Sequence, residues 1–218
     1  MQNTISLYQK PIVIKQESLP FTVRLVKNES DLMKAVSIRQ SAYERHVPEF
    51  AKLLQEPELA DYEDDTVVFL AESKDDGAPL GTIRIQSNFV RPLDLEKSVE
   101  LPTWLSESKI AEASRLGIVA SPQGSLIKDA LVKAFYLLCM KNSIDLMVIS
   151  ARRPLNRMYE KLCFSDVFSD LIPMKHIGNI PHKIMYFDVR SSYKTWTEHN
   201  HPGVEFFGLT HHPDISID

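Results

Sequence analysis

The clearest hydrophobic pattern of the chain lies between residues 110 and 164. An apolar run over 111–120 predicts a β-strand, and the turn 121–124 separates it from a segment with helical periodicity. In that segment apolar residues return every three or four positions, at Ile127, Ala130, Leu131, Ala134, Phe135 and Leu138. A second apolar run over 145–150 predicts a strand buried on both faces, and Pro154 opens another helix. The pattern therefore predicts a strand–helix–strand–helix unit.

The segments before this unit are expected to complete its sheet. Residues 21–27 alternate between apolar and polar and predict a strand, while Asn28 and its neighbours offer caps for a helix that ends near His46. Two β-rich segments, 66–73 and 79–86, flank an Asp-Gly turn and predict an antiparallel hairpin. An acidic loop over 48–65 connects the helix to the hairpin, and a short helix is expected near 104–108.

Beyond Phe164 the pattern returns to short strands, near 165–170 and 182–189. The segment from Ser191 is polar and aromatic, and we expect it to lie over the surface, partly ordered. The segment 11–14 is interpreted as a short strand or as part of an arm. We divide the chain into an N-terminal arm (1–20), one α/β (α+β) domain (21–190) and a C-terminal tail (191–218).

Composition narrows the class of protein. The chain has 218 residues, 44% of them hydrophobic, which favours one domain, and its net charge of −4 implies no general attraction to nucleic acid. Cys139 and Cys163 lie in apolar contexts, so we expect reduced core residues and a cytoplasmic protein. The first residues do not resemble a signal peptide, and no apolar run is long enough to span a membrane. The histidines lack metal-ligand spacing, so no metal is expected.

The order of predicted elements resembles the GNAT superfamily of N-acyltransferases over roughly residues 21–190. Two local motifs carry the resemblance: Val119-Ala120-Ser121-Pro122-Gln123-Gly124 before the long helix, and Met158-Tyr159-Glu160-Lys161-Leu162-Cys163-Phe164 at the end of the next one. The resemblance implies a mixed, mostly antiparallel central sheet flanked by helices, with two splayed central strands. It also implies direct transfer of an acyl group from a thioester to an amine, without a tightly bound cofactor.

The turn before the long helix departs from the family pattern. Gln123 matches the first position, but Leu126 and Lys128 stand where small residues let backbone N–H groups approach a pyrophosphate. This departure favours a donor without adenosine diphosphate, namely acyl carrier protein, with acyl-coenzyme A as the alternative. The expected contacts to the donor phosphate are Gln123, Gly124, Ser125 and Lys128. A basic group is expected to dock the acidic carrier protein: Lys128, Lys133, Lys141, Arg152, Arg153 and Arg157.

A set of charged residues is similar to that of the acyl-homoserine-lactone synthases. The resemblance assigns the acceptor to Arg39, Tyr43, Asp61, Asp64 and Arg84, and catalysis to Glu112, Arg115 and Tyr159. Glu112 would orient or deprotonate the amine, and Tyr159 would protonate the departing thiolate. Strand alternation puts Glu112 and Arg115 on opposite faces, so both reach one cleft only if a bulge lies between them. The alternative is that the charges brace the acidic loop and that Tyr159 is a packing residue.

The Ser114-Arg115-Leu116 run and the long N-terminal arm look closer to the N-acyl amino acid synthases. We therefore expect an N-acyltransferase that moves a long-chain acyl group to the amine of an amino-acid-like acceptor. The first alternative is an acyl-homoserine-lactone (autoinducer) synthase that uses S-adenosylmethionine. The second is a GNAT-shaped binding or regulatory module without catalysis.

Overall fold

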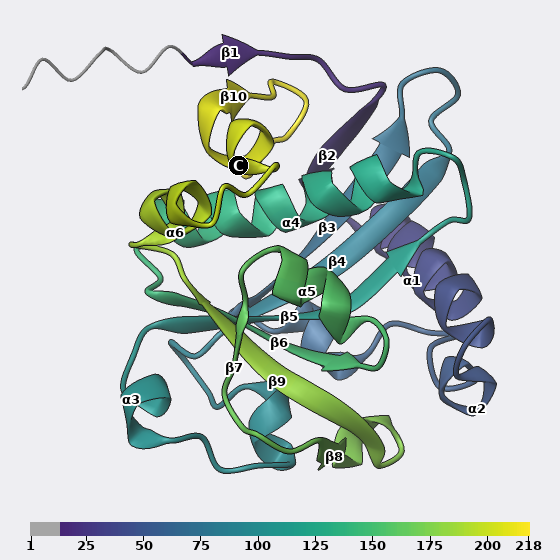
Figure 1. Cartoon of the computed structure of the whole chain (residues 1–218). Helices are drawn as coiled ribbons and strands as arrows, with labels where there is room; N and C mark the ends of the chain where they lie inside the picture. The colour runs from purple at the N-terminus through teal and green to yellow at the C-terminus, as the bar shows by residue number, and fades with distance from the viewer. Residues whose placement is uncertain (1–13) are drawn as a thin grey trace, which may run out of the picture.

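The predicted strands assemble into one main sheet, seen in a computed structural model that describes residues 14–218 (Figure 1). The sheet has the order β2-β3-β4-β5-β6-β9-β7, with β8 paired to β9. Every strand pair in it is antiparallel except β5–β6, which is parallel. The strands are β2 Phe21–Leu25, β3 Thr66–Ser73, β4 Pro79–Ser87, β5 Ile110–Ile118, β6 Leu146–Arg152, β7 Ser165–Asp166, β8 Ile172–Met174 and β9 Ile180–Asp188. The expected mixed, mostly antiparallel sheet is confirmed.

The two central strands splay apart. β5 and β6 pair from Ile110 with Leu146 up to Ala113 with Ile149, although both strands continue beyond these residues. A bulge lies in the same part of β5, because the register with β4 shifts between Thr82 and Arg84, and Arg115 has a φ of 53°. The bulge was predicted between Glu112 and Arg115, but it lies at Arg115 and Leu116, because Glu112, Ala113 and Ser114 still pair in regular register with β4. Beyond the last pair, the backbone of β5 no longer has β6 as a partner.

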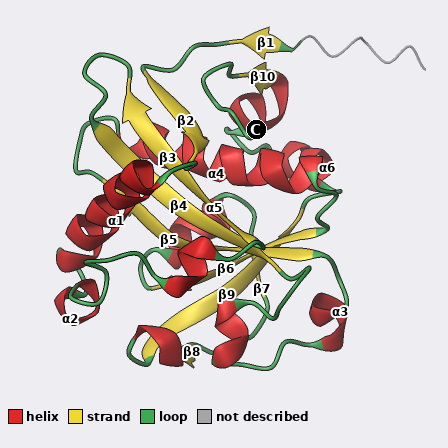
Figure 2. Cartoon of the chain, turned by 180° about the vertical axis from the view of Figure 1, so that it is seen from behind, coloured by secondary structure: helices red, strands yellow, loops and turns green. Residues whose placement is uncertain are grey.

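Helices cover both faces of the sheet. The amphipathic α4 lies on one face and α1 on the other, as the front and back views show (Figure 2). Asn28 caps α1 by accepting a 2.9 Å hydrogen bond from the Asp31 N–H. The helices are α1 Glu29–Glu44, α2 Pro48–Ala51, α3 Thr103–Ser106, α4 Gly124–Lys141, α5 Asn156–Lys161 and α6 Ser192–Glu198, with 3-10 turns η1 Leu59–Tyr62, η2 Asp94–Lys97 and η3 Lys175–Ile177.

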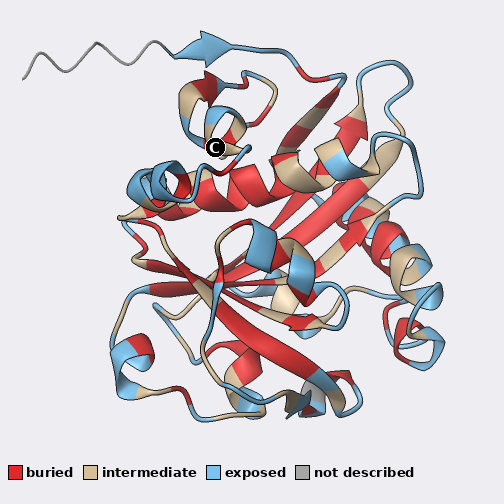
Figure 3. Cartoon of the chain, in the orientation of Figure 1, coloured by how far each residue is buried: buried red, intermediate tan, exposed pale blue. Residues whose placement is uncertain are grey.

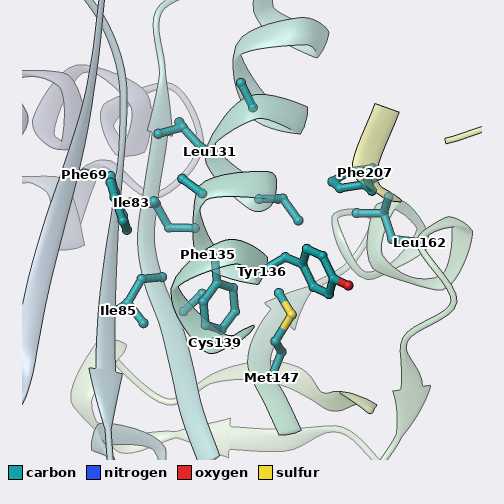
Figure 4. Packing of buried hydrophobic residues seen from close by; sticks show 14 of the residues in the cluster. Phe69, Ile83, Ile85, Leu131, Phe135, Tyr136, Cys139, Met147, Leu162 and Phe207 are labelled. Atoms are coloured by element: carbon teal, nitrogen blue, oxygen red, sulfur yellow. The ribbon is translucent and has the colours of Figure 1, made fainter. Parts of the chain in front are cut away.

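The main core lies between the sheet and α4. Figure 3 shows continuous burial along the central strands and the inner face of α4, and Figure 4 shows Phe69, Ile83 and Leu131 packed together there. Gly81 lets α4 approach closely, since a Cβ at this position would lie 2.7 Å from Ile127 Cγ2. A second apolar cluster fills the opposite face below the splay, around Val148 and Ile184.

The C-terminal segment contradicts the expectation of a partly ordered surface tail. Trp196, Phe207 and Ile215 are buried in the main core, and the described residues continue to Asp218. A π-helix, η4 (Glu205–Leu209), leads into β10 (Thr210–His211), which pairs in parallel with β1 (Lys15–Gln16). The expectation was wrong because its aromatic residues find partners on α4 that lie far away in the sequence. Of the arm, residues 1–13, which include most of the segment 11–14, lie outside the described residues.

Candidate active site

A cleft of about 540 Å³ opens where β5 and β6 diverge. Its apolar wall comes from α1 and α2, from the segment leading into α5, and from β9, with Phe50, Leu155 and Ile180 among the contributors. Its polar side chains are Tyr43, Arg45, His46, Ser114, Arg115, Lys128, Ser150, Arg152 and His182. None of the described residues that line it is a carboxylate. The cleft therefore combines apolar surface with positive charge.

The bulge turns Arg115 into this cleft. Its guanidinium lies 5.0 Å from the centre of the Phe50 ring, which in turn packs at 5.6 Å from the ring of Tyr43. Arg115 is also bound by Glu58 through two hydrogen bonds of 2.6 Å. Burial alone would lower the pKa of Arg115, but the Glu58 carboxylate raises it, so the guanidinium stays charged. Of the residues predicted from the charged set, Arg115 and Tyr43 reach the cleft.

Beneath the cleft wall, a buried ion-pair network ties the acidic loop to the sheet. Arg39 Nη1 donates to both Asp61 oxygens at 2.8 Å, and Arg84 contacts Asp61, Glu58 and Asp94 at 3.4, 3.0 and 3.0 Å. Arg39 and Arg84 are each 1% exposed, and neither lines the cleft. Burial lowers the pKa of Arg39. These side chains bind one another, which is the bracing arrangement, and their role toward an acceptor remains a prediction.

Asp64 does not take the position predicted for it, and Glu58, for which no role was predicted, joins the ion-pair network instead. Asp64 is exposed and is absent from the network, whereas Glu58 joins Arg84 to Arg115. Burial favours the neutral acid of Glu58, but the hydrogen bond and charge of Arg115 lower its pKa to about 2. The sequence offered little to distinguish these carboxylates, because both lie in an irregular acidic loop whose path depends on tertiary contacts.

Glu112 lies two residues before the cleft residue Ser114 on the same face of β5, but it does not reach the cleft. Its side chain is 1% exposed, Oε2 accepts a 3.1 Å hydrogen bond from the Leu95 N–H, and Oε1 is buried without a partner in the described residues. Burial raises the pKa of Glu112 to about 7, and Asp94 adds to the shift while Arg84 opposes it. Glu112 is absent from the cleft lining. A direct contact between Glu112 and an acceptor amine is therefore not made in this conformation.

Tyr159 packs into the main core. Its ring meets Phe164 edge to face at a centroid distance of 5.3 Å, and its side chain is 5% exposed. Burial raises the pKa of its phenol, with a smaller contribution from Tyr43. Within the described residues no hydrogen bond holds the hydroxyl, and the adjacent Met158, rather than Tyr159, lines the cleft. The observed contacts are those of a packing residue, and the role as a general acid stays a prediction.

The predicted donor contacts begin α4. Gln123 is exposed at the start of the helix, Gly124 is its first residue, and Ser125 is exposed one position later. Lys128 lies one turn further and lines the cleft, 3.4 Å from Asp129. The N-terminal part of α4 therefore borders the cleft, which it reaches with the Lys128 side chain.

The predicted basic docking group is wrong at Lys133, which is buried, whereas Lys141 is exposed. Lys133 is 2% exposed and donates to the carbonyl oxygens of Phe206 and Thr210 instead of facing solvent. Lys141 contacts Asp218 at the end of the chain. Arg152 faces the cleft. The missing information was the path of the C-terminal segment, which lies over α4 beside Lys133 (Figure 1).

Two further cleft residues were not among the residues assigned by resemblance to the acyl-homoserine-lactone synthases. Arg152, near the end of β6, and His182, on β9, stand directly opposite each other in the strand register. Arg152 was predicted only as part of the docking group for the carrier protein, and no role was predicted for His182.

The described residues also limit other chemistries. Burial raises the pKa of both cysteine thiols, and neither Cys139 nor Cys163 lines the cleft. Among residues 14–218, no group of three or more His, Cys, Asp or Glu side chains is arranged to hold a metal ion. No helix in that range has the length and apolar character needed to cross a membrane.

Solved structures resemble the chain. A scan against models of protein families finds no match, and a search of curated proteins finds none. FeeM, an N-acyl amino acid synthase from uncultured soil microbes, superposes with a TM-score of 0.66 at 18% identity, over 82% of this chain and 96% of that one. BjaI, a CoA-dependent acyl-homoserine lactone synthase, gives 0.58 at 14% identity, over 88% and 93%. The fold is that of the GNAT acyltransferases.

The GNAT fold extends to further solved structures, including an acyl-CoA N-acyltransferase from Pseudomonas aeruginosa, with a TM-score of 0.52 and 18% identity over 76% of this chain and 97% of that one. At such identities the likeness shows the shared fold. The divergence of β5 and β6, the bulge at Arg115 and the cleft between them are features of this chain's own structure.

Proposed function

We propose that the protein is an N-acyltransferase that moves an acyl group from a thioester donor to the amine of a carboxylate-bearing, amino-acid-like acceptor. The observation that carries the proposal is the cleft at the β5–β6 splay, which is apolar along its walls and cationic at its polar positions. An apolar wall suits a long acyl chain, and cations suit the phosphate of a donor arm and the carboxylate of an acceptor.

The reaction needs little beyond positioning and polarisation. The unpaired backbone around the bulge at Arg115 offers N–H groups to the thioester carbonyl, which gains negative charge as the amine attacks. A C–N bond forms, the C–S bond breaks, and the sulfur leaves as a thiol with a proton that the amine has given up. No acyl-enzyme is required, because the amine attacks the donor directly.

The charge of the cleft favours an anionic acceptor over S-adenosylmethionine. S-adenosylmethionine carries a positive sulfonium, and the described cleft residues supply no carboxylate to receive it. Arg152 has no carboxylate partner among the described residues, and its guanidinium suits a carboxylate bound through two oxygens. The lactone synthase remains the second candidate, because its charged set recurs in this chain and because BjaI shares the fold.

The donor is proposed to be acyl carrier protein, with acyl-coenzyme A as the competing donor. Leu126 packs against the main core at the first turn of α4, and Lys128 turns toward the cleft. Bulky side chains at these positions leave less room for a pyrophosphate at the helix start than small residues do.

The test is an acylation assay with purified protein. Long-chain acyl carrier protein and acyl-coenzyme A are supplied in turn, with an amino acid mixture or S-adenosylmethionine as acceptor, and products are identified by mass spectrometry. N-acyl amino acids support the proposal, acyl lactones support the second candidate, and no thioester consumption with any donor contradicts both and favours a binding module.

Arg152→Gln tests the acceptor site within the same assay. Loss of a charge-assisted hydrogen-bond pair is expected to raise the KM for the amino acid by roughly 10-fold to 100-fold while the KM for the donor changes little. Arg190→Gln is the matched control, since Arg190 is an exposed arginine just beyond β9, near the opposite end of β6. Equal acceptor KM values in the two variants would remove Arg152 from the acceptor site.

A further inference from the structure

His182 is a titratable side chain of the cleft, and a hydrogen bond to the backbone fixes the orientation of its ring. Its Nδ1 lies 2.8 Å from the carbonyl oxygen of Ile180. A carbonyl oxygen only accepts, so Nδ1 carries the hydrogen and donates it, and the neutral ring then presents an unprotonated Nε2. His182 is 5% exposed and lines the cleft, which leaves Nε2 as the ring nitrogen available to a bound molecule.

The position of His182 matches the acceptor side of the cleft. The last β5–β6 pair joins Ala113 to Ile149, so the splay begins at Ser114 and Ser150, which both line the cleft. His182 stands opposite Arg152, two residues or roughly 7 Å along β6 from Ser150. Directly opposite residues of an antiparallel pair share a face, so Arg152 and His182 extend to the same side.

The charges around His182 keep it neutral. Burial lowers its pKa below the ordinary value, the Ile180 carbonyl opposes this shift, and the charge of Arg152 reinforces it. Tyr43, His46 and Arg115 line the same cleft, its β8 neighbour is Ile172, and the described lining contains no carboxylate that would hold it protonated. A neutral imidazole with a fixed tautomer is a proton acceptor rather than an anion ligand.

We propose that His182 is the general base of the acyl transfer and removes a proton from the ammonium form of the acceptor. This role rests on the proposed function. Nε2 takes one proton from the ammonium, the freed amine attacks the thioester carbonyl, the C–S bond breaks, and the second amine proton leaves with the sulfur as a thiol. The imidazolium then returns its proton to solvent. The positive charges of Arg115 and Arg152 assist this proton transfer, because they disfavour the ammonium form of the bound acceptor.

His182 thereby takes the task that the sequence assigned to Glu112. Glu112 is covered by η2 through the Leu95 N–H and does not line the cleft, whereas His182 does. The two assignments predict different variants to lose activity.

The experiment is the pH dependence of kcat/KM for the acceptor in the wild type, His182→Asn and His182→Gln. The wild type is expected to lose activity below a break under pH 6.5 and to level off above it. His182→Asn keeps an amide N–H for Ile180 but has no base. Its kcat/KM for the acceptor is expected to be lower than that of the wild type by at least about 100-fold at pH 7. Above pH 7 this kcat/KM is expected to rise about tenfold per pH unit, because only the free amine fraction of the acceptor reacts.

Two controls separate a base from a structural residue. His46→Asn alters the other cleft histidine and is expected to retain the acidic break. Arg152→Gln removes the neighbouring positive charge and is expected to move the break to higher pH, which a merely structural His182 would not produce.

An active wild type without an acidic break, or a His182→Asn or His182→Gln protein that keeps both the break and a rate within about threefold of the wild type, overturns this role alone. A wild type that transfers no acyl group from any donor overturns the proposed function and this role together. Loss of the break in a folded variant, shown by circular dichroism and an unchanged donor KM, supports it.

Discussion

Glu112 shows how strongly burial controls a single carboxyl group in this protein. Its environment offers one backbone N–H and leaves Oε1 without a partner in the described residues, so the charged form is poorly compensated. The pKa of about 7 means that the folded state holds a proton that the unfolded chain releases near pH 4.5. Ionised Glu112 therefore destabilises the fold as the pH rises.

Glu112→Gln is expected to be more stable than the wild type at pH 8 and nearly equal at pH 4.5. The raised pKa gives a penalty that is absent below pH 4.5, grows through pH 7, and reaches roughly 3 kcal/mol above it. Thermal unfolding of both proteins between pH 4.5 and 8.5 measures the difference. A difference that does not change with pH contradicts the assigned pKa, and unchanged turnover in Glu112→Gln would remove Glu112 from the mechanism.

Glu58→Gln tests the network that joins the acidic loop to the sheet. Arg115 loses its carboxylate partner, while Arg84 keeps Asp94 and Asp61. We expect a loss of about 3 kcal/mol, at the low end for a broken buried pair because the Glu58 side chain is 25% exposed. Urea unfolding provides the measurement. Glu63→Gln, an exposed neighbour, is the control and should stay within about 0.5 kcal/mol of the wild type.

At the scale of elements, the bulge of β5 and the C-terminal segment have the largest consequences. The bulge carries Arg115 to the face of Ser114 and ends the pairing with β6, so one irregularity both aims a side chain and opens the cleft. The segment 192–218 closes the far side of α4, where Lys133 donates to two of its carbonyl oxygens. α4 is thus packed between the sheet and the end of the chain.

Phe207→Ala is expected to destabilise the protein by about 3–5 kcal/mol, because Phe207 is 5% exposed and its ring centroid lies 5.4 Å from that of Trp196. Phe89→Ala is the matched control, since Phe89 is 53% exposed and should change stability by less than about 0.5 kcal/mol. Chemical denaturation compares the two. Equal stabilities would mean that the C-terminal segment does not contribute to the folded core.

At the scale of the whole molecule, the cleft passes between the two faces of the sheet. Val47 and Phe50 line it from the side of α1 and α2, while Lys128, Leu155 and Met158 line it from the side of α4 and α5. We infer that acceptor and donor enter from opposite faces and meet at the splay, as direct transfer requires.

Leu155→Trp and Val47→Trp separate the two entrances. A larger side chain at Leu155 narrows the α5 side and is expected to raise the KM for the thioester donor by about tenfold, with the acceptor KM nearly unchanged. Val47→Trp is expected to do the reverse. Steady-state kinetics with each substrate varied in turn gives the donor KM and the acceptor KM of each variant. A rise of both KM values in both variants would contradict separate entrances.

Elements with a local pattern could be predicted from the sequence alone. The periodicity of α4, the hairpin of β3 and β4, and the cap at Asn28 follow from spacing and turn chemistry, and the structure has them within a few residues. The order of these elements was enough to predict the GNAT-like fold. A bulge in this strand was also predicted, but its place at Arg115 and Leu116 brings Arg115 to the cleft and leaves Glu112 outside it.

Which charged groups face the cleft depends on tertiary contacts and could not be predicted from the sequence. Arg39, Asp61 and Arg84 lie in the predicted elements but are bound to one another, while His182 and Arg152 reach the cleft from strands that are distant in the sequence. Burial and charge pairing depend on all neighbours of a side chain, and a one-dimensional pattern specifies only its nearest ones. For the same reason the C-terminal aromatics, which lack periodicity, were assigned to the surface although α4 and the sheet bury them.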